Sequence, residues 1–442
     1  MSLINDLKKS DKKGIFTSNN VYDTYSTGFL PLDYLTAFWL TYEENGVKKK
    51  KLMKGLMGGK FITIIGYSGT GKTTLADQMA WSICNSYPDD ASEETIRKFK
   101  ENALMVHVDI EQTAIASRIT NITGASKTDM ENRIILDTEH LYIEDVMGMI
   151  DSICKAKEEN PSEYMYDIDG APFGLEKRAK VYVPTVFIID SLPAFTSSNV
   201  NAETLEGDMS TNRDVKQISQ FYMKLLGRIN KYNITVIAIN HIKSAIQINP
   251  YEPEKKQLML VKKGESLPRG QAPAFYSMYY FRLDASGSKA NMKSKDDDGY
   301  QGFIAYCQLA KTKSSFIGGV VPLVFNSENG YDPILTLLAF AMENHLYSGT
   351  RAGMTINGAS AYKFKAKEFK TKFLEDEGFR LAIVNALTPA LESLVGSVDE
   401  TGDGKGGFLP LNKLIGVNEN GDMYARQLLD TGEGSVIISS ES

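Results

Sequence analysis

The sequence predicts an α/β fold built on a central, mostly parallel sheet. Short runs of β-branched and aromatic residues have the pattern of buried strands, and helical patterns separate them. These strands are expected at residues 61–65, 103–109, 185–190 and 234–239. Continuous apolar runs that alternate with helices are typical of a parallel sheet covered on both faces. At 442 residues the chain is long enough for one large domain of this kind with smaller additions.

A phosphate-binding motif follows the first strand. It matches G-x-x-x-x-G-K-[ST] and consists of Gly66, Tyr67, Ser68, Gly69, Thr70, Gly71, Lys72 and Thr73, with Thr74 opening the next helix. The glycines let backbone N–H groups surround phosphate oxygens, and the helix N-terminus adds partial positive charge. Lys72 is expected to reach the β- and γ-phosphates and Thr73 to bind Mg²⁺. A chance glycine loop is the alternative, but it does not explain the flanking strand and helix. We therefore expect the chain to bind ATP.

Composition and charge restrict the classes of protein that fit. The chain is 42% hydrophobic and 24% charged, as in ordinary soluble proteins. No apolar run approaches the ~20 residues of a membrane helix, and the polar N-terminus lacks a signal core. The scattered Cys84, Cys154 and Cys307 fit reduced thiols. We expect a cytoplasmic protein without a membrane partner. The net charge of −6 requires any DNA site to be local.

Polar residues follow three of the expected strands. Glu111 lies two residues after Asp109, at the strand end where α/β sheets bind ligands. We expect it to activate the water that attacks the γ-phosphate, with an exposed strand-end acid as the alternative. Asp190 ends an apolar run in a Walker B pattern and is expected to hold Mg²⁺ through water. His241 follows the next strand, where a γ-phosphate sensor and a structural role are equally compatible with its position.

Two segments look like additions to the expected core, one before it and one within it. The Asn45-Gly46 dipeptide predicts a β-hairpin at residues 36–55. Its returning arm carries four consecutive lysines, which are usually a solvated face and alternatively contact phosphates. Residues 158–184 are polar and rich in turn formers, and they are expected to form a surface insertion.

Two long loops are candidates for nucleic-acid contacts. They are expected at residues 193–212 and 242–270, and loops of this length in α/β domains are usually functional or disordered. The second carries more positive than negative charge, so we expect it to order on DNA. Its candidate DNA-binding residues are Lys243, Lys255, Lys256, Lys262, Lys263 and Arg269.

The last third of the chain continues the strand pattern and then changes character. Further strands are expected at residues 275–283, 302–309, 318–325 and 335–340. Residues 362–395 are rich in helical pattern and charge. We divide the chain into an N-terminal segment with the hairpin, an ATPase core and a small C-terminal helical module, at residues 1–55, 56–347 and 348–442.

Taken in chain order, these motifs resemble the RecA family of recombinases, closest to the phage UvsX-like branch. The resemblance covers residues 22–347. It rests on Ser26-Thr27-Gly28 with Leu32-Asp33, the phosphate loop, Asp109-x-Glu111, Ile189-Asp190-Ser191, Asn240-His241, and residues 270–276 followed by Arg282-Leu283-Asp284. Asn240-His241 resembles the phage branch, because bacterial RecA has glutamine at the second of these positions.

The resemblance implies a RecA-like P-loop ATPase core that assembles into a helical filament. ATP and Mg²⁺ would lie between subunits, and single-stranded or double-stranded DNA would lie along the axis against the two long loops. Lys311 and Lys313 fall where the family inserts lysines into the neighbouring ATP site. Arg118 falls where relatives stack a side chain on adenine. A single-strand-binding protein and a loading mediator are further candidate partners.

The function expected from this resemblance is a DNA-dependent ATPase that drives homologous pairing and strand exchange on single-stranded DNA. Two alternatives stay open. A hexameric replicative helicase motor shares the core but forms closed rings, and the chain shows no evident primase or helicase amino-terminal domain. A recombinase paralogue acting as a regulator would bind ATP without hydrolysis, but the presence of Glu111 and Asp190 argues against it.

Overall fold

The computed structural model describes residues 21–88, 90–175, 178–198, 209–244, 261–285, 302–314, 317–395, 415–417 and 423–425. Lys255 and Lys256 lie outside these ranges, as do residues 199–208 of the first expected DNA loop and residues 245–260 of the second. The described residues up to Val395 form one compact unit. A second unit contains the two-stranded hairpin of β20 (Ile415–Val417) and β21 (Met423–Ala425). The boundaries at residues 55 and 347 stay predictions.

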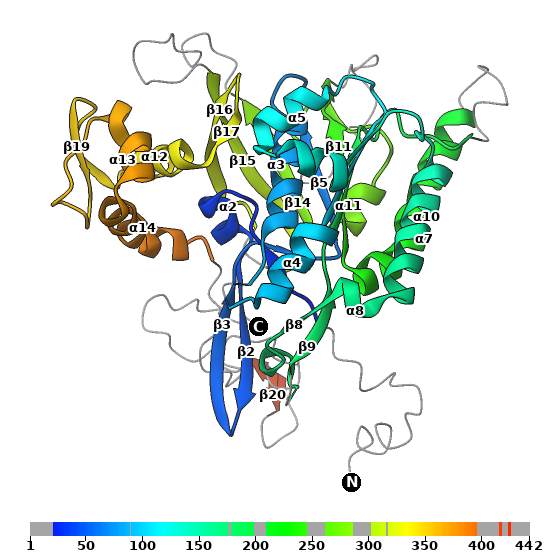
Figure 1. Ribbon diagram of the computed structural model, residues 1–442, viewed down its shortest axis with the longest axis horizontal. Helices are drawn as coiled ribbons and strands as arrows, with labels where there is room; N and C mark the ends of the chain where they lie inside the picture. The colour runs from blue at the N-terminus through cyan, green and yellow to red at the C-terminus, as the bar shows by residue number, and fades with distance from the viewer. Residues whose placement is uncertain are drawn as a thin grey trace. The chain divides into compact units, whose positions relative to one another are not determined.

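A nine-stranded, mostly parallel sheet forms the centre of the first unit (Figure 1). Its order is β17 (Gly330–Asp332), β16 (Val320–Asn326), β15 (Gly302–Thr312), β14 (Tyr279–Ala285), β5 (Phe61–Gly66), β11 (Ile234–His241), β10 (Thr185–Asp190), β6 (Leu104–Asp109) and β7 (Ile134–Asp137). The strands from β14 to β7 are parallel, and β15, β16 and β17 extend the sheet in antiparallel pairings. The predicted α/β fold class is confirmed.

Helices cover both faces of this sheet, which explains why its central strands are apolar without alternation. Every residue of β5 and β10 is buried. The helix α3 (Lys72–Asn85) packs on one face, where Leu75 and Met79 join Ile62 in one core. The helices α7 (Ile143–Glu159) and α10 (Met209–Tyr232) pack on the other face, where Phe221 joins Phe61 in a second core. Successive strand residues thus supply opposite cores.

Shorter elements surround this framework. The helices are α2 (Leu30–Leu35), α4 (Glu93–Asn102), α5 (Ala116–Thr123), α6 (Lys127–Asn132), α8 (Pro161–Tyr164), α11 (Ala272–Tyr276), α12 (Pro333–Glu343), α13 (Phe369–Glu375) and α14 (Glu377–Glu392), with 3-10 turns at Ala171–Phe173 and Ala366–Glu368. Small two-stranded sheets pair β1 (Thr24–Tyr25) with β4 (Leu56–Met57), β12 (Lys243–Ser244) with β13 (Glu265–Ser266), and β18 (Tyr347–Thr350) with β19 (Gly353–Ile356). No helix in the described ranges is long and apolar enough to cross a membrane.

The predicted lysine-bearing hairpin is present. It pairs β2 (Phe38–Glu44) with β3 (Val47–Met53) and projects from the sheet (Figure 1). The turn residues Asn45 and Gly46 have φ of 53° and 74°, the left-handed geometry that Asn-Gly favours in a two-residue hairpin turn. The four lysines are exposed. Lys49 forms an ion pair with Glu44 at 2.5 Å, so part of the charge is balanced within the hairpin.

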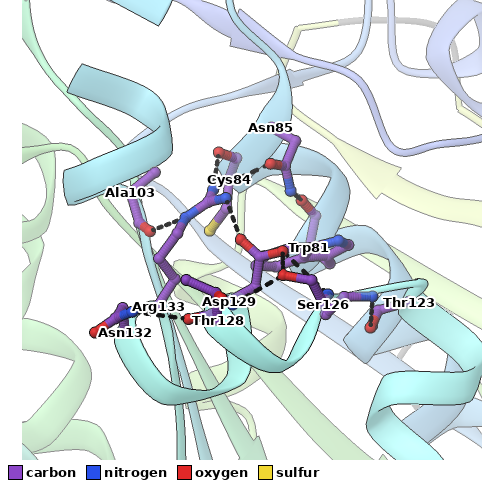
Figure 2. A network of polar contacts seen from close by, with 11 residues as sticks. Trp81, Cys84, Asn85, Ala103, Thr123, Ser126, Thr128, Asp129, Asn132 and Arg133 are labelled. Carbon is purple, nitrogen blue, oxygen red and sulfur yellow. Dashed lines mark hydrogen bonds and ion pairs between the residues drawn. The ribbon is translucent and has the colours of Figure 1, made fainter. Parts of the chain in front are cut away.

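A buried arginine fixes the end of α3 that lies far from the phosphate loop (Figure 2). Arg133 is 4% exposed and donates to the carbonyl oxygens of Cys84 and Ala103 at 2.9 and 3.3 Å. It also donates to the Asp129 carboxylate at 3.0 Å. Its guanidinium lies 4.6 Å from the centre of the Trp81 ring. One side chain thus joins the end of α3, the start of β6 and the helix α6.

Residues 335–340 were expected to form a strand, but they lie within the helix α12. An apolar run of six residues does not distinguish a buried strand from a buried helix. The start signals lie just before it. Asp332 accepts from the backbone N–H groups of Ile334 and Leu335, both at 2.9 Å, and Pro333 occupies the first turn. The strand expected from residue 275 similarly begins at Tyr279, because the residues before it form α11.

Residues 158–184 were expected to form a surface insertion, and they lie outside the nine-stranded sheet, but one side of the segment is buried. They form α8 and a hairpin of β8 (Met165–Ile168) and β9 (Ala179–Tyr182). Tyr166 is 2% exposed. Its hydroxyl lies 2.8 Å from that of Tyr25 and donates to Asp23 at 2.8 Å. Polar partners distant in sequence therefore help to bury one side of a segment that composition alone placed at the surface.

Candidate functional site

The phosphate loop joins β5 to α3, in the setting predicted from the sequence. Gly69 and Gly71 have φ of 77° and 79°, in the left-handed region that favours glycine. A Cβ on Gly71 would lie 2.5 Å from the hydroxyl of Tyr331. That hydroxyl donates to the carbonyl of Thr70 at 2.7 Å. The phosphate loop is therefore held in place by Tyr331 of β17, a three-residue strand whose sequence contains no phosphate-binding motif.

Lys72 lies at the start of α3 and is 5% exposed. Its ammonium donates to the carbonyl oxygen of Tyr67 at 2.7 Å. Burial lowers the pKa of Lys72 to about 8, while the carboxylates of Asp190 and Glu111 act in the opposite direction. A buried ammonium beside a helix N-terminus is suited to an anionic ligand, because it has few water molecules to lose on binding.

Thr73 and Asp190 meet beside the lysine. The Thr73 hydroxyl donates to the Asp190 carboxylate at 2.5 Å, and Asp190 is 3% exposed. Burial raises the pKa of Asp190 to about 6, against the opposing effect of this hydroxyl. Hydroxyl and carboxylate oxygens are the hard ligands that Mg²⁺ prefers, and one cation would satisfy the buried charge. The two residues therefore fit the predicted Mg²⁺ position.

Glu111 lies where β6 and β10 end side by side. The backbone N–H groups of Ile110 and Glu111 donate to the carbonyl of Asp190 at 2.7 and 3.2 Å. The Ser191 hydroxyl donates to the Glu111 carboxylate, and His241 Nε2 lies 3.2 Å from the same oxygen. Burial and the Lys72 ammonium lower the pKa of His241, so the imidazole is neutral at pH 7.

The carboxyl ends of three strands thus bring three predicted residues together. One potential ligand atom each from Glu111, Asp190 and His241 lies within 4.8 Å of the others. The strands β6, β10 and β11 are neighbours in the sheet, so their ends converge beside the phosphate loop. A carboxylate in this position can accept a proton from a water molecule next to a bound triphosphate.

Replacement of Asp190 by asparagine is expected to stabilise the nucleotide-free protein at pH 8. The pKa of Asp190 is about 6 in the folded chain against an ordinary 3.8, so folding favours its protonated form. Stability is therefore lost as pH rises from about 4 to 6, by about 3 kcal/mol. Asp190→Asn removes this cost and keeps an acceptor for Thr73. We expect a higher urea midpoint at pH 8 and a difference that disappears below pH 4.

Asp137 provides a control of opposite sign at the end of β7. Burial raises its pKa, but the backbone N–H groups of His140 and Glu139 outweigh this effect and lower it. Asp137→Asn is therefore expected to reduce the urea midpoint at pH 8. If both variants shifted the midpoint in the same direction, the account of Asp190 would be wrong.

Arg118 contacts the turn between β16 and β17. Its guanidinium donates to the carbonyl oxygens of Ser327 and Glu328 at 2.7 and 2.6 Å. Its stacking on adenine stays a prediction. The sequence did not indicate Gln78, whose amide holds the same region by donating to the carbonyl oxygens of Ile122 and Tyr331 at 3.0 and 2.9 Å.

Lys311 and Lys313 lie at the level where the parallel strands begin, whereas the phosphate loop lies where these strands end. The strand β15 runs antiparallel, so Thr312 lies at the level of Ile62, near the start of β5. The phosphate loop leaves the sheet at the other end of β5, at Gly66. Within one chain, these lysines therefore lie away from the expected γ-phosphate position.

The two lysines differ in their surroundings. Lys311 donates to the carbonyl oxygens of Ala274, Phe275 and Ser277 at the end of α11, the last two at 2.9 and 3.3 Å. Burial lowers the pKa of Lys311, and the charge of Lys313 adds to this effect. Lys313 is exposed. Of the pair, Lys313 is thus the better placed to reach another molecule.

The described candidates for DNA binding lie near the ends of the second long loop. Lys243 is exposed on β12, Lys263 is exposed in the turn before β13, and Lys262 forms an ion pair with Asp284 at 3.0 Å. Arg269 has a φ of 67° and donates to the carbonyl oxygens of Leu192 and Pro193. It thus connects the bases of the two expected loops, and its contact with DNA stays a prediction.

Comparison with known protein families gives one match. Residues 35–245 match the model of the AAA domain, and this range includes the phosphate loop, Glu111, Asp190 and His241. The match covers slightly less than half of the chain. Together with the fold, it supports a P-loop ATPase, and it does not distinguish a recombinase from a helicase motor. A search of curated proteins found no match.

Proposed function

We propose that the chain is an ATP-dependent DNA recombinase that assembles on single-stranded DNA and catalyses homologous pairing and strand exchange. The observation that carries the proposal is the separation of two sets of charged residues. Glu111 and Lys72 lie where the parallel strands end, and Lys313 is exposed at the level where these strands begin. Head-to-tail stacking of copies would place Lys313 of one copy against the ATP site of the next and complete that site.

In the proposed reaction, the phosphate loop and Lys72 bind the triphosphate. Glu111 orients a water molecule and accepts its proton as the oxygen bonds to the γ-phosphorus. The bond to the β-phosphate oxygen breaks, and ADP and inorganic phosphate leave. The hydroxyl of Ser191 holds the Glu111 carboxylate in place, and the neutral imidazole of His241 lies 3.2 Å from the same carboxylate oxygen. A Mg²⁺ ion held by Thr73 and Asp190 would neutralise charge on the phosphates.

DNA binding is proposed to depend on the same site. The chain enters both expected DNA loops from strand ends beside Glu111, after β10 and after β11. Arg269 joins the bases of these loops through the carbonyl of Pro193. Occupancy of the ATP site would therefore affect both loops, and hydrolysis would weaken the hold on DNA.

A subunit-mixing experiment tests this proposal. Lys72→Ala should abolish ATP turnover, and Lys313→Ala should reduce it strongly, each assayed with single-stranded DNA. In a mixture, the Lys72→Ala copies supply Lys313 to intact phosphate loops on their neighbours. When equal amounts of the two variants stack at random, about one interface in four joins an intact phosphate loop to a copy that supplies Lys313. Activity is therefore expected to return to about a quarter of wild type. Activity no greater than the sum of the separate variants would contradict a shared ATP site.

A further inference from the structure

The side chain of Tyr67 makes a contact that phosphate binding does not require. Phosphate loops bind their ligand through backbone N–H groups, so the side chain after the first glycine is free to serve another purpose. Tyr67 is 40% exposed, and its hydroxyl donates to the carboxylate of Glu265 at 3.1 Å. Glu265 begins β13, close to where the second expected DNA loop returns. The phosphate loop and the base of this loop are thus in direct contact.

Glu265 is a rigid acceptor. The Arg282 guanidinium grips both of its oxygens, at 2.6 and 2.7 Å, and both side chains are buried. The backbone N–H of Lys262 donates to it at 2.8 Å. The hydrogen bonds from Arg282 are the main cause that lowers the pKa of Glu265, so the carboxylate is charged at neutral pH. Arg282 is anchored in turn by Asp284 on the same strand, at 2.8 and 3.0 Å.

The other end of Tyr67 is held by the lysine that is expected to bind phosphate. Lys72 donates to the carbonyl of Tyr67 at 2.7 Å. A hydrogen bond from an ammonium to a charged phosphate oxygen is about twice as strong as one to a neutral carbonyl. A bound triphosphate therefore competes with the Tyr67 carbonyl for the Lys72 ammonium. When the ammonium turns to the phosphate, its hydrogen bond to the Tyr67 backbone is weakened.

The far side of the contact carries two candidate DNA-binding residues. Lys243 on β12 pairs with Ser266, the residue after Glu265. Lys262 is joined to Glu265 through its backbone and to Asp284 through its ammonium, at 3.0 Å. A change at Tyr67 thus has a short, continuous route to both lysines.

We propose that Tyr67 is a positioning residue that transmits occupancy of the phosphate site to the β12–β13 ladder and to Lys243 and Lys262. Lys72, Tyr67 and Glu265 form the route. The expected effect on DNA affinity rests on the function proposed above. The expected effect of nucleotide on the β12–β13 pair does not depend on that function.

Hydrogen exchange tests the route without DNA. A non-hydrolysable ATP analogue, saturating for each variant, should change the exchange rates of the backbone amides at residues 262–267 in the wild type. Tyr67→Phe removes only the hydroxyl, and it should reduce this change at least fivefold. Tyr87→Phe is the control, because Tyr87 is exposed to a similar extent, 39%, and its ring packs on Phe99, away from the site. The same change in Tyr67→Phe as in wild type, or no change in wild type, would overturn the proposal.

The affinity for a single-stranded oligonucleotide tests the consequence. We expect the analogue to raise this affinity in wild type by a factor that Tyr67→Phe and Glu265→Ala each reduce at least fivefold, within the usual range of coupling between sites. Tyr67→Phe should cause no further loss in a Glu265→Ala background, because alanine has already removed the acceptor of the Tyr67 hydroxyl. A further loss from Tyr67→Phe in that background would contradict a single route. DNA affinity that ignores the analogue in wild type, with the exchange result intact, would overturn the proposed function and leave the route established.

Discussion

Glu111→Gln is expected to reduce the rate of ATP hydrolysis by about 10²- to 10⁴-fold, the usual contribution of a general base. Glutamine keeps the size of the side chain and an oxygen that accepts from the Ser191 hydroxyl, but it does not take a proton at neutral pH. ATP binding should change little, because the phosphate loop is untouched. Single-turnover hydrolysis and titration with a fluorescent ATP analogue separate the two effects.

Glu139 offers a matched control for this substitution. It lies two residues after Asp137 at the end of β7, as Glu111 lies two residues after Asp109 at the end of β6, and it is exposed. Glu139→Gln should leave hydrolysis within about twofold of wild type. Equal activity of the two variants would show that Glu111 is only an acid at the end of a strand.

Arg133→Ala is expected to lower the free energy of unfolding by about 3 kcal/mol. The substitution leaves the carbonyls of Cys84 and Ala103 without a partner in a buried site and removes the ion pair with Asp129. Loss of hydrogen bonds from a charged group and loss of a buried partner both cost several kcal/mol. Urea unfolding should show a lower midpoint with an unchanged slope.

Two further variants make this result specific. Arg97 forms an ion pair with Glu101 along α4, with both side chains about half exposed. Arg97→Ala should cost less than about 0.5 kcal/mol, as exposed pairs do. Arg133→Lys should fall between the two, because an ammonium does not reproduce the planar set of donors. A cost for Arg133→Ala no larger than that for Arg97→Ala would contradict the role of the network in Figure 2.

Local patterns predicted much of the fold. The strands β5 and β10 are continuous apolar runs, and they have this pattern because both faces of the sheet are covered. The Asn45-Gly46 turn signal predicted the lysine-bearing hairpin correctly. The helix α12 was missed because the strand was judged from six apolar residues, although Asp332 and Pro333 supply a helix start signal just before them.

The parts of the site that could not be predicted depend on partners distant in sequence. Tyr331 holds the phosphate loop from 261 positions away, and Tyr67 meets Glu265 across 198. Tyrosine and glutamate are common in loops, and nothing in their local sequence indicates such pairing. Ser191 was noticed beside Asp190, but its hydrogen bond to Glu111 became visible only when the ends of β6 and β10 were seen together.

Electron microscopy of the full chain tests the central claim most directly. Purified protein would be imaged with a non-hydrolysable ATP analogue and single-stranded DNA, and again without nucleotide. We expect helical filaments that require both ligands, because an ATP site completed by a second copy stacks subunits head to tail. Closed six-membered rings, or single particles under all conditions, would contradict the account.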